Sequence, residues 1–205
     1  MSTTDKNTES SDYYHNYCGR IATAMGSLEV TDRSGKTIPS RAAIDLLCEK
    51  SRSIFEKGRK QYICGNGASA AFASHMALDW TKNGRVPTHC FNDSALLTAM
   101  GNDLGYEQAF SAPLSWYAKS GDLLITVSSS GSSPNIIETI HTARAKGMEV
   151  ITVSSLKADN PSRSLGDMNL YIPGASYGIA ESAHQILLHI WLDRYIDKYS
   201  PGGSV

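Results

Sequence analysis

The chain has 205 residues, 41% of them hydrophobic, and a formal net charge of −1, which suits one globular domain with a full hydrophobic core. It carries no basic run or basic face of the kind that binds nucleic acid. No stretch approaches the roughly 20 consecutive apolar residues that a membrane span needs. Composition therefore excludes a nucleic-acid-binding or membrane-spanning protein and favours a small molecule or another protein as the partner.

The N-terminal residues and the cysteines indicate a cytoplasmic protein. The chain begins MSTTDKNTESSDYY, which is polar and acidic and is not a secretory signal. The four cysteines stand singly among apolar neighbours without a CxxC pair, as is typical of free thiols in a reducing compartment.

Residues 1–39 are predicted to form a polar tail and a helix ahead of the main domain, which is expected over residues 40–200. The helix of this N-terminal extension is expected over residues 13–25. Residues 26–39 contain two glycines and a proline, so they are predicted to form a connecting loop.

The main domain begins with a predicted helix over residues 41–57, with Ser40 as its N-cap. Short apolar runs then alternate with helical stretches. The predicted strands are residues 61–64, 88–91, 123–127, 150–153 and 170–172. The predicted helices are residues 70–82, 95–100, 106–117, 135–146 and 180–198. Such alternation predicts a three-layer α/β/α sandwich around a five-stranded parallel sheet, with an N-terminal helical extension.

A Ser-rich turn with the sequence SSSGSS, residues 128–133, follows the predicted strand 123–127. A helix is expected to begin near Pro134, which suits the first helical position. Free N–H groups at a helix N-terminus, together with serine hydroxyls, form a site for an anion such as phosphate. The alternative is a polar turn with Ser133 as N-cap, but one cap accounts for one or two serines and not for five.

A second turn with the sequence GNGAS, residues 65–69, lies between the predicted strand 61–64 and the helix 70–82. Its glycines permit a tight turn, while Asn66 and Ser69 offer polar groups at a helix start. Two such turns in one sheet predict a phosphosugar site, in which one turn binds the phosphate and the other binds sugar hydroxyls.

The chain resembles the SIS (sugar isomerase) domain family in two segments, YICGNGASAAFASH and ITVSSSGSSPNIIETIHTARAKGMEVITV. Within that family it is most similar to the sedoheptulose 7-phosphate isomerases, also called phosphoheptose isomerases. The resemblance runs over residues 41–197, with further matches at residues 92–93 and 101–103. It implies a flavodoxin-like sheet and a homotetramer whose active sites are built between subunits.

The resemblance also implies which residues bind the substrate. The phosphate is expected to bind to Ser128, Ser129, Ser130 and Ser133. The sugar is expected to bind to Asn66, Gly67 and Ser69, and Asp93 matches a substrate-contacting acid of the family.

His75 and Asp79 are four residues apart and lie on one face of a predicted helix. From spacing alone they form a metal-binding pair, an acid/base pair or a solvated pair. The resemblance matches them to a His-x-x-x-Glu motif whose members bind zinc and whose Glu acts on the substrate. Asp79 is one methylene shorter than that Glu, so the geometry of direct proton abstraction differs.

The last predicted helix carries Glu181, His184 and His189. The resemblance places Glu181 at the position of a Gln ligand and His189 at that of the second catalytic His, whereas His184 is expected to be a packing or interface residue. Eight residues of helix span about 12 Å, so Glu181 and His189 share an ion only if their side chains reach towards each other. Otherwise they serve the sites of different subunits. The expected ligands of Zn²⁺ or another divalent ion are His75, Asp79, Glu181 and His189.

The resemblance implies aldose–ketose isomerisation of sedoheptulose 7-phosphate through an ene-diol, in the supply of heptose for a surface polysaccharide or related glycoconjugate. His189 is the expected acid/base on one side, and Asp79 or Glu181 on the other. Two alternatives stay open: an SIS isomerase for another phosphosugar, and a non-catalytic SIS regulator that binds a sugar phosphate and a protein partner.

Overall fold

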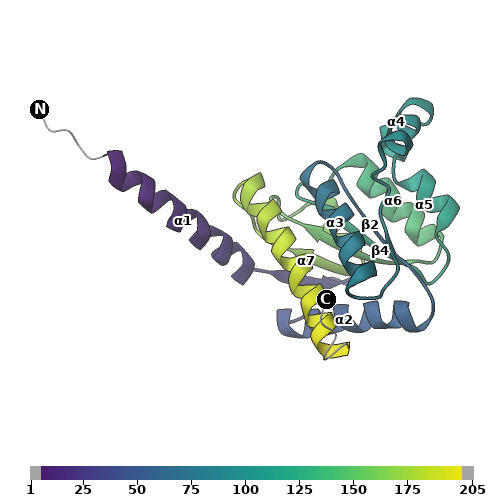
Figure 1. The fold of residues 1–205 in the computed structure, drawn as a ribbon, viewed down its shortest axis with the longest axis horizontal. Helices are drawn as coiled ribbons and strands as arrows, with labels where there is room; N and C mark the ends of the chain where they lie inside the picture. The colour runs from purple at the N-terminus through teal and green to yellow at the C-terminus, as the bar shows by residue number, and fades with distance from the viewer. Residues whose placement is uncertain (1–5, 200–205) are drawn as a thin grey trace, which may run out of the picture.

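The computed structural model describes residues 6–199, and their central feature is a six-stranded sheet in the order β1-β6-β5-β4-β2-β3 (Figure 1). Five of these strands are parallel neighbours: β2 (Gln61–Gly65), β3 (Thr88–His89), β4 (Leu123–Ser128), β5 (Glu149–Ser154) and β6 (Met168–Tyr171). Counted along the chain, they follow the flavodoxin-like order 2-1-3-4-5. All five predicted strands and the predicted α/β class are therefore confirmed.

The sixth strand corrects the prediction of a loop over residues 26–39. β1 (Glu29–Asp32) pairs antiparallel with β6 at the edge of the sheet. Val30 is buried against the core, while the side chain of Asp32 accepts the backbone N–H groups of Ser34 and Lys36 and closes the following turn. A four-residue strand with one buried side chain gives too little alternation to be recognised. The N-terminal extension thus contributes a strand to the sheet as well as a helix.

Helices cover both faces of the sheet. One face carries α2 (Ser40–Glu56), α3 (Ala68–Lys82) and α7 (Tyr177–Tyr199), and the other carries α5 (Ser111–Tyr117) and α6 (Pro134–Ala145). Alternate strand residues divide the core, since Ile63 and Ile125 belong to the first side and Tyr62 and Leu124 to the second. α4 (Ser94–Asp103) lies beyond the carboxyl end of the sheet (Figure 1).

The helix α1 (Lys6–Gly26) projects away from the body of the molecule (Figure 1). Its C-terminal half packs on the core through Ile21 and Met25, whereas Tyr13 and Tyr14 are exposed. None of the helices in the described part of the chain combines the length and the apolar character needed to cross a membrane.

Two local predictions need correction. Ser40 is the first residue of α2, and Pro39 occupies the N-cap position without a side-chain hydrogen bond. The predicted helix over residues 106–117 is divided into a short 3₁₀ turn, η1 (Tyr106–Gln108), and α5. The left-handed φ of +87° at Gly105 sets the direction of the turn before this segment.

The four cysteines are free. Cys48 and Cys64 are buried, and burial raises their pKa values to about 11 and about 12, so both remain protonated thiols. Cys18 on α1 is exposed.

Candidate active site

The two predicted turns meet at the point where the strand order of the sheet reverses. β2 and β4 are parallel neighbours, with Gly65 opposite Val127, and each strand ends in one of the turns. Ligands of open α/β sheets bind at such a switch point. A pocket of about 290 Å³ opens there, lined by Ser128, Ser129, Ser130, Ser133, Asn66, Gly67, Ala68, Ser69, Val127, Tyr177 and Glu181.

Gly65 allows the two turns to approach closely. A Cβ atom at this position would lie 2.7 Å from the carbonyl oxygen of Val127 and 2.5 Å from the Cβ of Ser69. Only a residue without a side chain fits between the strand β4 and the first turn of α3. Gly67 then takes a left-handed φ of +55° at the start of α3.

The Ser-rich turn presents hydroxyl groups that have no partner within the described chain. Ser129 Oγ is buried without a hydrogen bond, and Ser133 occupies the N-cap of α6 without a side-chain cap bond. Ser128 Oγ accepts the N–H of Gly131, and Ser130 Oγ accepts the N–H of Ser132. Unused donors at a helix N-terminus suit a phosphate group, which accepts several hydrogen bonds.

Gly131 is held in place from the neighbouring segment. Its carbonyl oxygen accepts the backbone N–H and the hydroxyl of Ser162, at 3.0 and 2.9 Å. Its φ is +59°, and a Cβ atom there would collide with the side chain of Asn160. These contacts hold the Ser-rich turn within the chain itself and favour this conformation without a ligand.

Asn66 is tied to the N-terminus of α6. Its side-chain amide exchanges two 2.9 Å hydrogen bonds with that of Asn135, and Asn66 Oδ1 also accepts the hydroxyl of Tyr106 at 3.1 Å. One N–H of the Asn66 amide remains for a ligand. Sequence reasoning missed Asn135 and Tyr106, because an amide in a helix and a tyrosine in a turn give no signal of their own.

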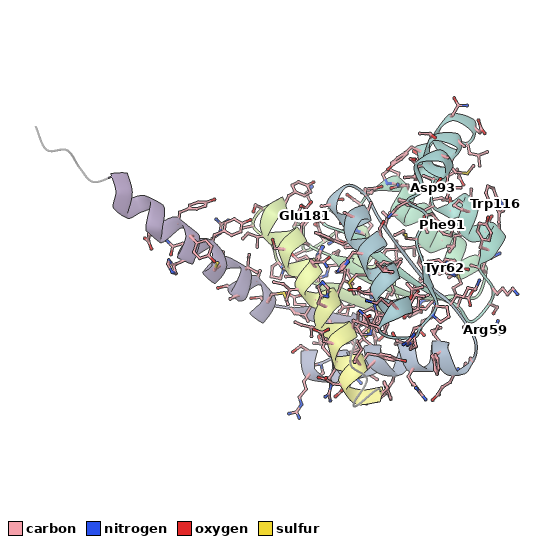
Figure 2. The ribbon with its side chains drawn as sticks, viewed as in Figure 1. Arg59, Tyr62, Phe91, Asp93, Trp116 and Glu181 are labelled. Atoms are coloured by element: carbon pink, nitrogen blue, oxygen red, sulfur yellow. The ribbon has the colours of Figure 1, made fainter. Side chains whose placement is uncertain are left out.

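Asp93, by contrast, does not line the pocket. It is the N-cap of α4, and its Oδ1 accepts the backbone N–H of Leu96 at 3.0 Å. Figure 2 shows it near the start of the projecting α4 segment. Its second carboxylate oxygen stays exposed, so a substrate contact by Asp93 remains a prediction.

A second cluster lies between α3 and α7, where His75, Asp79 and His189 converge. One potential ligand atom from each of the three side chains lies within 4.8 Å of the others. His75 Nε2 is 3.2 Å from Asp79 Oδ2, and the rings of His75 and His189 are 5.3 Å apart. The edge-to-face contact of Trp80 with Trp191 beneath them fixes the spacing of the two helices.

Glu181 lies outside this group, near the start of α7 (Figure 2), and lines the pocket between the two turns. The four predicted metal ligands are thus divided between two places within one chain. His189 Nε2 lies 2.7 Å from Gln185 Nε2, one helical turn earlier, so the amide of Gln185 holds the imidazole in position.

Known proteins resemble the chain in sequence and in structure. The SIS domain family matches residues 37–155. A phosphoheptose isomerase from Fusobacterium nucleatum subsp. nucleatum is 33% identical over 159 residues, which cover 75% of this chain and 81% of that protein. The chain belongs to the SIS domain family.

Further relatives of this SIS domain chain point to the same group. A phosphoheptose isomerase from Campylobacter concisus is 34% identical over 153 residues, which cover 72% of this chain and 80% of that protein. Among solved structures, a phosphoheptose isomerase from Neisseria gonorrhoeae superposes with a TM-score of 0.78 at 24% identity, covering 93% of this chain and 99% of that one. The sequence likeness places this SIS domain chain among relatives of that name, and the structural likeness supports its fold.

The cluster between α3 and α7 of this SIS domain protein suits a divalent metal. Two imidazoles and one carboxylate are a donor set typical of zinc and similar ions, and they leave further coordination positions free. His75, Asp79 and His189 therefore fit the metal that the family resemblance implies.

His184 takes no part in either site. It is fully buried, and neither ring nitrogen makes a hydrogen bond of normal geometry within the described chain. Burial lowers its pKa to about 4, which the nearby backbone of Ser154 only partly offsets. His184 is therefore a neutral packing residue of α7. The sequence predicted either a packing residue or an interface residue at this position.

Proposed function

We propose that this sugar-phosphate isomerase interconverts sedoheptulose 7-phosphate and the corresponding aldose 7-phosphate through an ene-diol. The observation that carries the proposal is the buried, unpartnered hydroxyl of Ser129 in a pocket at the switch point of the sheet. The relatives named phosphoheptose isomerase supply the substrate class.

The Ser-rich turn binds the phosphate and so positions the rest of the sugar. Binding energy from a group remote from the reacting carbons holds the open-chain form and lowers the entropic cost of reaction. Ser129 and Ser133 donate hydroxyl protons to the phosphate oxygens, and the N-terminus of α6 adds its dipole.

Proton transfer falls to the cluster on α3 and α7. A base removes the proton beside the carbonyl and returns it to the neighbouring carbon, while a second group moves the hydroxyl proton. We assign His189, oriented by Gln185, to one of these steps and Asp79 to the other. Glu181 is the alternative base, and its place in the phosphate pocket favours Asp79 in the role.

His75, Asp79 and His189 would hold the divalent metal, with Zn²⁺ the first choice. A bound ion of this kind polarises a carbonyl or hydroxyl oxygen as a Lewis acid. The metal content of the purified protein tests this assignment. Full isomerase activity after complete removal of metal by EDTA would contradict it.

The active sites are proposed to lie between subunits of a cytoplasmic homotetramer. The projecting α1 with its exposed Tyr13 and Tyr14 supports an oligomer, since a single chain leaves them uncovered. Co-expression of His189→Ala with a Ser129→Ala/Ser130→Ala variant is the test. Mixed oligomers regain activity if the two groups of residues come from different chains, and stay inactive if each site belongs to one chain.

Turnover of sedoheptulose 7-phosphate, measured with and without added Zn²⁺, decides between the candidate functions. Turnover of this substrate supports the proposal. Turnover of a pentose or amino-sugar phosphate alone assigns the protein to another SIS isomerase activity. Binding without any turnover, abolished by Ser129→Ala, identifies a regulator instead.

A further inference from the structure

A second pocket, of about 280 Å³, lies on the face of the sheet opposite α3 and α7. Its lining residues are Lys60, Tyr62, His89, Cys90, Phe91 and Tyr117. They come from the edge strand β3 and the two residues after it, from the neighbouring strand β2 and the residue before it, and from the end of α5, and none of them lines the phosphate pocket. The helix that follows β3 is α4, which lies beyond the end of the sheet and leaves this edge uncovered (Figure 1).

Aromatic rings form the floor and one wall of this edge pocket. Phe91 stacks on Tyr62 with centroids 5.7 Å apart and on Tyr117 with centroids 6.2 Å apart, and the interplanar angles are 20° and 22°. His89 lies 5.9 Å from Tyr62 at 32°. Phe91 is therefore stacked with the rings of Tyr62 and Tyr117, whereas His89 is tilted against Tyr62. Tyr62 and Phe91 are buried, whereas His89 and Tyr117 are exposed at the mouth.

The hydroxyl of Tyr62 is buried and has no hydrogen-bond partner within the described chain. Only 1% of the residue is exposed, and burial raises its pKa to about 12, so the group is a protonated donor. An unsatisfied buried hydroxyl is unfavourable, which makes a polar group of a ligand its natural partner.

Lys60 places a positive charge beside the edge pocket. Lys60 makes no ion pair with any residue that the structure describes. The carboxylate oxygens of Asp122 accept the backbone N–H groups of Lys60 and Lys119 at 3.0 and 2.8 Å. Burial and the charge of Lys60 lower the pKa of His89, so this imidazole is neutral and can both donate and accept.

We propose that the edge pocket binds a nucleotide, with the base against the exposed ring of Tyr117 and the phosphate on Lys60. The exposed face of Tyr117, backed by the stacked ring of Phe91, suits a flat ring and offers little to the puckered carbon chain of a sugar. Tyr62 and His89 supply hydrogen bonds to the base edge. Arg59 and Trp116 lie along the same side of the molecule as Tyr62 and Phe91 (Figure 2). This site is separate from the proposed isomerase site and does not depend on it.

Calorimetric titration of the full chain with AMP, GMP, CMP and UMP tests the proposal, with adenosine and inorganic phosphate as partial ligands. At least one nucleotide should bind with a millimolar or tighter Kd. Tyr117→Ala should weaken that binding by about tenfold or more, because it removes the stacking surface. Lys60→Ala should weaken the binding of the nucleotide and leave the Kd of adenosine unchanged. Phe55→Ala, at an exposed aromatic residue of α2, is the control and should change nothing.

Tyr62→Phe removes only the hydroxyl and keeps the ring, so it tests the base contact without opening a cavity. The proposal is overturned if no nucleotide binds, or if Tyr117→Ala and Lys60→Ala leave binding intact. It is also overturned if Ser129→Ala alone abolishes binding, because the nucleotide phosphate then occupies the phosphate pocket. A smaller oligomer for Tyr117→Ala in sedimentation would show that a second copy covers this face, and that too overturns it.

Discussion

The imidazole rings of His75 and His189 lie 5.3 Å apart, although they belong to helices from opposite ends of the main domain. Their proximity follows from the packing of α3 against α7, in which Trp80 and Trp191 meet edge to face at 5.4 Å. His75 occurs two turns into α3, and His189 occurs about three turns into α7. The cluster therefore lies about 10 Å along the helices from the phosphate pocket at their N-terminal ends.

Replacement of His189 by alanine should remove both metal affinity and proton transfer. The isomerase rate is expected to fall by about a hundredfold or more, the usual effect of losing a general acid or base. The zinc content of the purified protein should fall with it, because only His75 and Asp79 would remain in the group. His141→Ala, at an exposed histidine of α6, is the control and should keep both activity and metal. If the His189→Ala variant kept its full zinc content and full activity, His189 would not belong to the active site.

Ser129→Ala should weaken substrate binding without loss of stability. A hydrogen bond to a charged phosphate contributes about 1.5–3 kcal/mol, so KM is expected to rise by about tenfold or more while kcat changes little. The free energy of unfolding should not fall, because Ser129 Oγ has no partner to lose within the described chain. Ser132→Ala serves as the matched control, since Ser132 is exposed and does not line the pocket. Equal KM values for the two variants would argue against phosphate binding by Ser129.

The sequence predicted the five parallel strands well because each is a short apolar run closed by turn residues. It missed β1, whose single buried side chain, Val30, gives no alternation. The pairing of this strand with β6 depends on a segment far along the chain, which no local pattern reveals. The sequence likewise placed the N-cap of α2 at Ser40, one position after the true N-cap, because Pro39 already fits the N-cap conformation.

The parts of the site that lie in strand-to-helix turns could be predicted from the sequence. The hydrogen bonds between side chains of different segments could not. Four of the five serines of residues 128–133 line one pocket with residues 66–69 of the other turn, as expected from their places at the ends of β4 and β2. The hydrogen bonds of Asn66 with Asn135 and Tyr106 join three separate segments, so spacing could not reveal them. Helix periodicity did predict that His75 and Asp79 share a face, but not which of the last helix's residues would meet them.

His184 should make the protein less stable as the pH falls. Its pKa is about 4 in the folded chain against 6.5 as the reference value, so the unfolded chain binds the proton more readily. The contribution of neutral His184 is therefore present above pH 6.5 and is lost as the pH falls towards 4. Between pH 7 and pH 5 the loss should be about 2 kcal/mol in the free energy of unfolding.

Urea unfolding of the wild type and of His184→Leu at the two pH values measures that contribution. The wild type should lose about 2 kcal/mol more than the variant on acidification. The absolute stability of the variant does not matter, because the comparison is between pH slopes. Identical slopes would show that His184 gains a proton as readily in the folded chain as in the unfolded one.

Glu181→Gln should strengthen phosphosugar binding. Among the residues that the structure describes, Glu181 is the only charged one lining the phosphate pocket, so its carboxylate repels a phosphate dianion with no cationic side chain from residues 6–199 to offset it. Removal of the charge should lower KM by roughly fivefold. Steady-state kinetics on the wild type, on Glu181→Gln and on the exposed control Glu107→Gln measure the effect. If Asp79 and His189 move the protons, kcat stays near the wild-type value. A fall in kcat of about a hundredfold at unchanged KM would instead make Glu181 the base and would take that role from Asp79.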